Sequence, residues 1–390
     1  MYACCFHEVN KLKLEEHHHV RYPPFEASRW IPGALPIAIR KNTIGDFESE
    51  EEARTHLKTS PPSFTIGGED TWTIGRTYHL DGHPISFEHT EPHLEDQPYV
   101  NLVDRQRKGW YLIPNPIHNL VRRFINGVVI VLLLSLFYLF ISPVLILVGL
   151  PVYGLNTVRW GLLDYPALAI IVVPLIFAPL LIRVFANLGE LRRQQKFLRQ
   201  NPASPIITFV EPSTPTNPLR INLDFPEWND AWNHVDVSWR VGVLPPSREV
   251  LFETLGRSPN TQPPPGLSTD LPHHWEVGLD DGTAGGEDAP MELREAKGGL
   301  YLRPMRIMAN GGTARWKKGE VLELPPPADC WPGSVHTDLL RVHWECVMRI
   351  DRAKGGALLW VQPLNVAHSA QEALVADLLL HDGRSELDLT

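Results

Sequence analysis

The chain has 390 residues, of which 43% are hydrophobic and 21% are charged, and its formal net charge at pH 7 is -9. This acidic balance argues against nucleic-acid binding, because a protein that neutralises phosphates needs a basic face. The four cysteines offer neither the framework of a disulfide-rich domain nor the spacing of a zinc motif.

Residues 1–60 are predicted to be a largely disordered N-terminal segment with one short helix around the acidic run Glu50–Glu52. The first residues have neither the basic start nor the apolar stretch of a secretory signal peptide, so we expect none. Cysteine thiolates and histidine imidazoles near the N-terminus suit zinc. However, ligands that are adjacent in sequence rarely converge on one ion, so we expect no metal and no cofactor. The metal-ligand candidates that this argument sets aside are Cys4, Cys5, His7, His17, His18 and His19.

Residues 61–115 are predicted to form a short β-rich segment. Between Phe64 and Tyr111, short runs rich in Thr, Ile, Tyr and Phe are separated by glycines, which favours strands. Asp81 and Gly82 form a typical tight turn between two of these strands. Whether this segment belongs to the same soluble body as the C-terminal half stays open.

Two long uncharged stretches follow. Phe124–Val158 has 35 residues and Tyr165–Ile182 has 18, all without a charged side chain. Roughly 20 apolar residues cross a bilayer core as a helix, in which the backbone groups satisfy one another. Residues 116–200 are therefore predicted to be a transmembrane helical hairpin, with spans of about 124–150 and 165–187 and a cytoplasmic extension of the second helix. The chain is expected to be an integral membrane protein whose first partner is the lipid bilayer.

Basic residues predict the orientation of this hairpin. They are dense outside both spans, whereas the link between the spans contains only Arg159, beside Asp164. Cytoplasmic flanks are enriched in Lys and Arg, so both termini are predicted to be cytoplasmic. The flanks would also suit anionic lipid headgroups, although a plain topology signal is the simpler interpretation. The flanking residues are Arg105, Arg107, Lys108, Arg122, Arg123, Arg183, Arg192, Arg193, Lys196 and Arg199.

Residues 201–368 are predicted to form an antiparallel β-sandwich. In the segments His234–Val243 and Leu340–Asp351, apolar and polar residues alternate, as in strands with one buried face. Trp239 and Trp344 fall on the apolar faces, and we expect them to fill the structural core.

Two further segments complete the chain. Residues of about 256–298 are rich in Pro, Gly and Asp and are predicted to be a disordered insert within the sandwich. In residues 369–381, Ser369 and Glu372 have the spacing of a capping box, which predicts a C-terminal amphipathic helix.

A resemblance to a known family rests on two segments, LRVHWECVMRIDRAKGGALLWVQPLNV and RPMRIMANGGTARWKKGEVLELP. The first has an alternating strand with a Trp, a polar link and a strand that ends in Pro-Leu-x-Val. The second has an aromatic-basic-Gly-Glu turn at Trp316–Glu320 between two strands. Together they resemble the arrestin-like β-sandwich superfamily, most of all the bacterial membrane proteins that pair such a sandwich with a transmembrane hairpin. The resemblance implies a binding or scaffolding module and supplies no functional residue.

The predicted fold class is therefore mixed, with a transmembrane α-helical hairpin plus a cytoplasmic antiparallel β-sandwich that is arrestin-like or immunoglobulin-like. Sequence motifs of hydrolases, nucleotide-binding proteins and zinc proteases are missing. The uncharged stretches Phe124–Val158 and Tyr165–Ile182 offer no charged residue for a proton or ion path. We expect a membrane-anchored, non-enzymatic protein whose β-sandwich binds or organises a protein partner.

Two alternatives stay open. One is a membrane-bound enzyme whose site is formed between the N-terminal and C-terminal soluble parts. The other is a pore or transporter subunit, although two helices line a pore only in an oligomer. The polar residues that motivate the enzyme hypothesis are His79, His83, His89 and His93. The sequence leaves enzymatic activity undecided and favours its absence.

Overall fold

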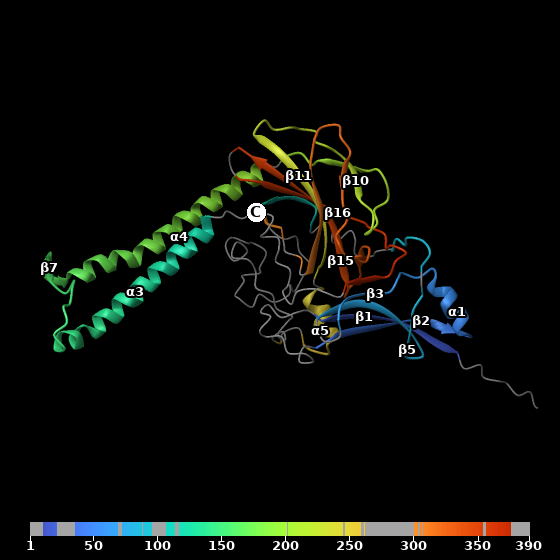
Figure 1. The fold of residues 1–390 in the computed structure, drawn as a ribbon, viewed down its shortest axis with the longest axis horizontal. Coiled ribbons are helices and arrows are strands. Elements are labelled where there is room, and N and C mark those ends of the chain that lie inside the picture. Colours follow the sequence, from blue (N-terminus) through green and yellow to red (C-terminus); the bar gives the residue numbers. More distant parts are fainter. Residues whose placement is uncertain are drawn as a thin grey trace, which may run out of the picture. The chain divides into compact units, whose positions relative to one another are not determined.

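The structure is a computed structural model, and its chain divides into two compact units (Figure 1). The first, here called the β unit, contains residues 1–113 and 202–390, and the second, called the helical unit, contains residues 114–201. Antiparallel sheets dominate the first unit and two long helices the second, so the chain is of the mixed class. The residues that the structure describes are 11–21, 36–68, 72–87, 89–95, 107–113, 117–200, 202–244, 246–258, 261, 300–302, 305, 307–353 and 356–375.

Among the described residues, six strands form a sheet of mainly N-terminal origin. They are β1 Leu12–Arg21, β2 Ala38–Phe47, β3 Phe64–Gly67, β4 Thr73–Leu80, β5 His83–Ile85 and β17 Ala373–Val375. The order is β17-β3-β4-β1-β2, with β5 paired to β4, and only β17 is parallel to its neighbour. Asp81 and Gly82 join β4 to β5 and both have positive φ, as a type I′ turn requires. The predicted tight turn is confirmed.

The prediction of a largely disordered segment over residues 1–60 is wrong for β1 and β2, which pair along most of their length. The predicted short helix is present as α1 Glu50–Leu57, and the hydroxyl of Ser49 caps it by accepting from the Glu52 amide. The sequence pattern does not predict β1, because the buried face of this strand carries His18 as well as Leu14. A polar residue on the buried face breaks the alternation of apolar and polar residues that indicates a strand.

A second sheet, here called the central sheet, has the order β12-β11-β15-β16-β6, with β14 paired to β15. Its strands are β6 Gly109–Leu112, β11 Trp232–Val243, β12 Ile307–Arg315, β14 Val335–His336, β15 Arg341–Arg352 and β16 Leu358–Leu364. Antiparallel pairing sets Trp239 opposite Cys346 and Val241 opposite Trp344 on one apolar face. Trp239 and Trp344 are fully buried, and their ring centroids lie 5.0 Å apart.

A three-stranded sheet lies against this apolar face. Its strands are β9 Ile206–Phe209, β10 Leu219–Asp224 and β13 Leu322–Leu324. The indole of Trp239 donates to the carbonyl of Pro325 at 2.7 Å, and the indole of Trp316 donates to the carbonyl of Leu223 at 3.0 Å. These bonds satisfy buried polar groups while the rings fill the space between the layers. A short helix, α5 Arg248–Thr254, follows β11.

Strands that precede the helical unit pair with strands that follow it. β6 pairs with β16, with Trp110 opposite Trp360, and β3 pairs with β17, with Ile66 opposite Val375. Residues 61–113 and the C-terminal half therefore share one unit. The predicted sandwich over residues 201–368 is therefore not complete on its own, because β6 from the N-terminal half adds a strand to the central sheet.

The prediction of a helix over residues 369–381 is wrong for the described residues of this segment, because Ala373–Val375 form the strand β17. The Ser369 hydroxyl donates to the Gln371 carbonyl instead of capping a helix, and pairing with β3 satisfies the backbone of β17. Residues 376–381 lie outside the described residues, as does nearly all of the predicted insert at 256–298.

The helical unit contains two long helices and a small hairpin between them. These are α3 Ile117–Leu147, β7 Thr157–Trp160, β8 Leu163–Pro166 and α4 Ala167–Arg199. α3 and α4 pack against each other, and β7 pairs with β8 (Figure 1). Among the described residues, one helix is long and apolar enough to cross a membrane, and its candidate span is Arg123–Leu147.

Candidate functional site

The predicted basic flanks fall into different environments. Arg105 lies outside the described residues, and Arg122 belongs to α3. Lys108 and Arg123 are exposed. Arg107 is buried, and its Nε and Nη2 donate to the two carboxylate oxygens of Glu345 at 2.8 and 3.1 Å. Arg107, predicted as a basic residue of the membrane flank, thus lies in a buried ion pair, which a charge count along the sequence cannot distinguish from a solvated cation.

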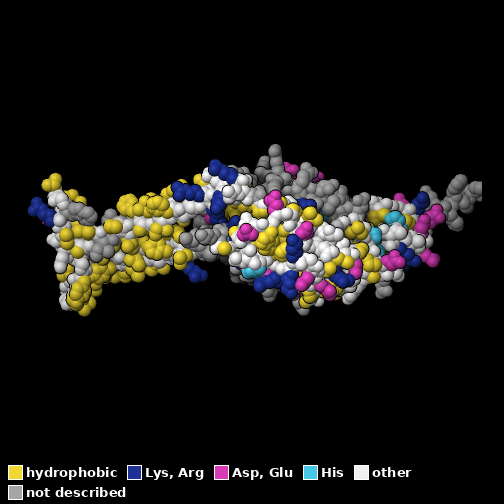
Figure 2. All heavy atoms as spheres, turned by 90° about the horizontal axis from the view of Figure 1, so that it is seen from above, with side chains coloured by type: hydrophobic (Ala, Val, Ile, Leu, Met, Phe, Trp, Pro, Cys, Tyr) yellow, Lys and Arg dark blue, Asp and Glu magenta, His cyan; other side chains and the backbone are white. Residues whose placement is uncertain are grey.

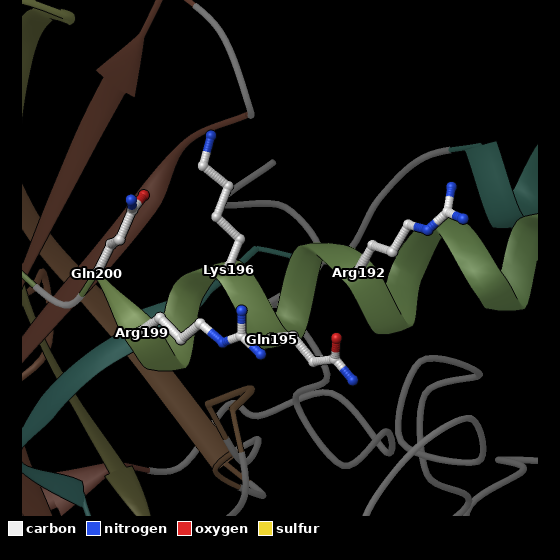
Figure 3. A pocket seen from close by; sticks show the side chains of 5 residues that line it. All are labelled: Arg192, Gln195, Lys196, Arg199 and Gln200. Atoms are coloured by element: carbon white, nitrogen blue, oxygen red, sulfur yellow. The ribbon is translucent and has the colours of Figure 1, made fainter.

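The basic residues at the end of α4 share one helix face. Arg192, Lys196 and Arg199 are spaced by four and three residues, so they project from neighbouring turns. With Gln195 and Gln200 they line a pocket of about 320 Å³, which Figure 3 shows along the helix surface. Three cations on one face can bind an anion. Arg193 lies off this face and contacts Glu190 at 3.4 Å.

The polar face of the central sheet holds a buried ion cluster. Glu345 of β15 stands opposite Arg240 of β11, and the Arg240 Nε donates to the carboxylate at 2.7 Å. With Arg107 on its other side, Glu345 thus faces two guanidinium groups, and all three side chains are buried. Burial raises the pKa of the Glu345 carboxyl, but the two arginines outweigh that effect and hold the pKa well below its ordinary value.

Two histidines extend this cluster. His343 Nε2 lies 3.2 Å from Glu345, and His343 Nδ1 lies 3.2 Å from His336 Nε2. Since a carboxylate only accepts, His343 donates from Nε2 and accepts at Nδ1 from His336. Burial, together with the neighbouring His343 and Arg341, lowers the pKa of His336 well below its ordinary value. His336 is therefore neutral at physiological pH.

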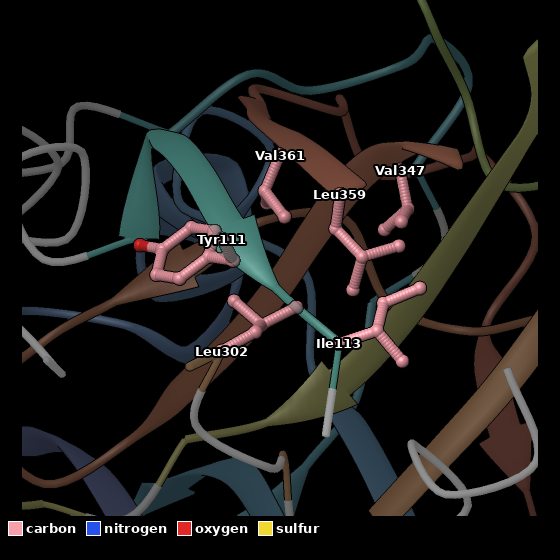
Figure 4. Close-up of a cluster of buried hydrophobic side chains, with 6 residues drawn as sticks. All are labelled: Tyr111, Ile113, Leu302, Val347, Leu359 and Val361. Carbon is pink, nitrogen blue, oxygen red and sulfur yellow. The ribbon is translucent and has the colours of Figure 1, made fainter. Parts of the chain in front are cut away.

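An apolar cluster lies on the same face of the central sheet as the ion cluster. Figure 4 shows its side chains gathered together: four come from β6, β15 and β16, and Ile113 and Leu302 lie outside these strands. Val347 is two residues from Glu345, so both project from the same face of β15. Tyr111 belongs to the cluster, and its hydroxyl donates to the carbonyl of Arg107 at 2.7 Å. The cluster consists of Tyr111, Ile113, Leu302, Val347, Leu359 and Val361.

A second buried cluster also joins the two ends of the chain. Arg76 of β4 donates from both terminal nitrogens to Glu95, at 2.8 and 3.0 Å. His368 Nδ1 accepts from the Gly333 amide at 3.2 Å, so its Nε2 carries the proton and donates to Glu95 at 2.6 Å. Burial raises the pKa of Glu95, but Arg76 and His368 bring it down to about 2. Burial lowers the pKa of His368.

These Glu-His pairs have the composition of a general acid and base, but their position argues for a structural role. Glu345 and His343 are 0% exposed, and Glu95 and His368 are 8% and 2% exposed, so a substrate has no access to them. What they do is hold segments from both sides of the helical unit in one fold. One sequence signal could have indicated the Arg240–Glu345 pair. Each residue is a charged side chain in the middle of a strand whose neighbouring residues are mostly apolar.

The four histidines that motivate the enzyme hypothesis, His79, His83, His89 and His93, do not form one group. His79 stacks on His17 with centroids 4.0 Å apart, while His89 lies near His93 with centroids 6.2 Å apart, and His83 is exposed. His17 and His18 project from opposite faces of β1, as successive strand residues do, which separates two of the rejected metal candidates. Cys4, Cys5 and His7 lie outside the described residues.

The long strand β2 forms one edge of its sheet and pairs only with β1 among the described strands. Most of its side chains are exposed, including Ile39 at 47%, and Lys41 and Asn42. An edge strand presents unpaired backbone groups to which an extended segment of another chain can add. β2 is therefore a candidate surface for binding a peptide segment.

A comparison with models of known protein families finds no match to this chain, and a search of curated proteins finds no similar sequence.

Removing the carboxylate of Glu345 is expected to destabilise the protein strongly. In the Glu345→Ala variant, Arg107 and Arg240 stay buried without a counter-charge, which costs about 3–5 kcal/mol. Glu323→Ala is the matched control, because Glu323 is 62% exposed and lies 3.9 Å from Arg220, and it is expected to change stability by less than about 1 kcal/mol. Urea unfolding of the full chain measures both, and equal losses would contradict the assignment.

Acidification is expected to destabilise the β unit as the pH falls below about 6.5. The folded state lowers the pKa of His336 and His368, so below 6.5 the unfolded chain binds more protons than the folded chain does. The lowered pKa values of Glu95 and Glu345 extend the loss below pH 4.5. Thermal unfolding at about pH 7.5 and about pH 5.5 should show a lower midpoint at the acidic pH. His336→Gln should reduce this difference and His83→Gln should not, whereas a midpoint independent of pH would refute the argument.

Proposed function

We propose that this protein is a membrane-anchored, non-enzymatic binding protein with two spans, which presents its β unit on the cytoplasmic side. The observation that carries the proposal is the pairing of β6 with β16. β6 ends at Leu112, shortly before α3, and β16 begins at Leu358, after α4. Paired strands share one compartment, so a chain that leaves it through α3 has to return to it.

The composition of α4 supports its role as the returning span. Its first part belongs to the uncharged stretch Tyr165–Ile182, and it packs against α3. Figure 2 shows apolar side chains covering most of the helical unit, with Lys and Arg side chains towards its ends. The 33 residues of α4 have a length of about 50 Å, whereas a bilayer core is about 30 Å thick. The basic end of α4 would then project into water.

The distribution of basic residues supports the cytoplasmic orientation. Arg123 at one end of the span in α3, and Arg192, Lys196 and Arg199 at the end of α4, precede and follow the two apolar stretches. The hairpin of β7 and β8 contains Arg159, and Asp164 stands opposite it. The excess of Lys and Arg at the ends that connect to the β unit is typical of cytoplasmic segments.

The layered sheets support a binding role by analogy with arrestin-like and immunoglobulin-like sandwiches, although fold analogy does not identify a partner. The edge of β2 offers the contact, because an extended segment of a partner protein can continue the sheet there.

The alternative of an enzyme with a site between N-terminal and C-terminal parts has one observation in its favour. Glu95 and Glu345 each accept hydrogen bonds from side chains of both the N-terminal and the C-terminal part of the chain. Their burial weighs against it, because general acid-base catalysis needs contact with the substrate.

Membrane integration is expected to resist alkaline washing. If two helices cross the bilayer, sodium carbonate at high pH should leave the full chain in the membrane pellet, because the apolar segments have no aqueous state of comparable energy. Tags at both ends should be accessible only from the cytoplasmic side, and a label in the 148–156 segment only from the other. Release into the wash, or tags on opposite sides, would refute the proposal.

A photo-reactive side chain at Lys41 of β2 is expected to crosslink a partner protein in native membranes. Lys317 is the matched control, because it is also an exposed lysine of the β unit but lies in a loop after β12. A protein adduct at position 41 that is missing at position 317 is the predicted result. Adducts that are identical at both positions, or none at position 41, would count against β2 as the binding edge.

A further inference from the structure

Three metal-ligating side chains converge at one end of the central sheet, away from the ion cluster of Glu345. His234 and Asp236 are two residues apart on β11 and therefore project from the same face. Asp351 of β15 stands directly opposite His234 in the strand register. Two paired strands thus bring one imidazole and two carboxylates together.

The ligand atoms are close to the spacing of a metal site. His234 Nε2 lies 2.8 Å from Oδ2 of Asp351 and 3.3 Å from Oδ2 of Asp236, and all three atoms lie within 4.8 Å of one another. Zn²⁺ bonds to nitrogen and oxygen of about 2.0–2.1 Å in a tetrahedron separate ligand atoms by about 3.3 Å. Small side-chain rotations are enough to reach that geometry.

Two arginines hold the carboxylates so that one oxygen of each faces His234. Arg315 Nε donates to Oδ1 of Asp236 at 3.0 Å, and Arg349 Nε donates to Oδ1 of Asp351 at 3.3 Å. In each carboxylate the Oδ1 atom is engaged by an arginine, while the Oδ2 atom points to the imidazole. Hydrogen bonds of this kind orient the ligating carboxylates of metal sites.

The site is open to solvent on one side. The side chains of His234, Asp236 and Asp351 are 31%, 29% and 30% exposed. Three protein ligands and one solvent-facing position are the arrangement of Zn²⁺ sites that bind water as the fourth ligand. The mixture of one nitrogen and two oxygen donors suits Zn²⁺ better than Mg²⁺ or Ca²⁺, which prefer all-oxygen sites.

We propose that His234, Asp236 and Asp351 form a Zn²⁺-binding site on the β unit. Arg315 and Arg349 act as orienting residues, and their positive charges keep the affinity moderate. The competing explanation is an ion cluster in which His234 bridges the two carboxylates without any metal. The two explanations differ in one measurable property, which is whether the protein takes up Zn²⁺ at these residues.

Isothermal titration of the detergent-solubilised full chain with ZnCl₂ tests the proposal. The wild-type protein is expected to bind one equivalent of Zn²⁺ that is missing, or weakened at least about tenfold, in His234→Gln and in Asp351→Asn. The chain contains 17 histidines, so His83→Gln serves as the control for binding to other exposed imidazoles, and it should retain the equivalent.

Thermal unfolding supplies a second readout that is independent of the heat of binding. Zn²⁺ should raise the unfolding midpoint of the wild type and of His83→Gln, but not of His234→Gln or Asp351→Asn. All variants are compared by circular dichroism first, and the partial exposure of the substituted side chains favours intact folds. The proposal is overturned if the wild type binds no Zn²⁺, or if both site variants bind it as the wild type does.

Discussion

The pairing of β6 with β16 is the constraint on which the rest of the structure depends. It joins a strand that precedes two long helices to a strand that lies far beyond them in sequence. The Arg107–Glu345 ion pair holds this junction, because Arg107 lies just before β6 and Glu345 lies on the next strand but one. Such a buried ion pair contributes little net stability compared with a well-packed apolar pair in the same place. If either partner is misplaced, however, the other is left as an unpaired charge in the core. We infer that it specifies the position of β6 more than it strengthens the sheet.

The two faces of the central sheet have different functions. One face carries Trp239 and Trp344 against the three-stranded sheet, and its stability comes from buried apolar area. The other face changes along β11 and β15, from the half-exposed Asp236 and Asp351 at one end to the buried Arg240 and Glu345 further on. Charged residues on the same face of β11 and β15 therefore have two roles: the buried ones form an ion cluster, and the half-exposed ones are accessible to a ligand.

Local patterns in the sequence predicted part of this fold. The turn at Asp81–Gly82, the apolar α3, and the alternating strands that hold Trp239 and Trp344 each depend on residues that are close in sequence. β1 was not predictable in this way, because His18 is buried close to Glu16 and opposite Arg76 of β4, and that placement depends on strand pairing. β17 was also missed, since a three-residue strand that pairs with distant β3 overrides a local helix signal.

The candidate sites show the same limit. Arg107 has the position of a membrane-flanking cation, and only its contact with Glu345, which lies more than 200 residues away, shows that it is buried. The Arg76–Glu95–His368 cluster likewise has no local signature. The His234–Asp236–Asp351 group was partly visible as polar residues on two alternating strands, but its convergence requires the register between β11 and β15.

A disulfide between Leu112→Cys and Leu358→Cys tests the central claim most directly, because these residues stand opposite each other in β6 and β16. In isolated membranes treated with a mild oxidant, the account predicts that this bond forms. It also predicts that the two fragments stay joined after the link between α3 and α4 is cleaved from the non-cytoplasmic side. Failure of the bond to form in a folded protein, or cleavage of that link from the cytoplasmic side of intact membranes, would contradict the account.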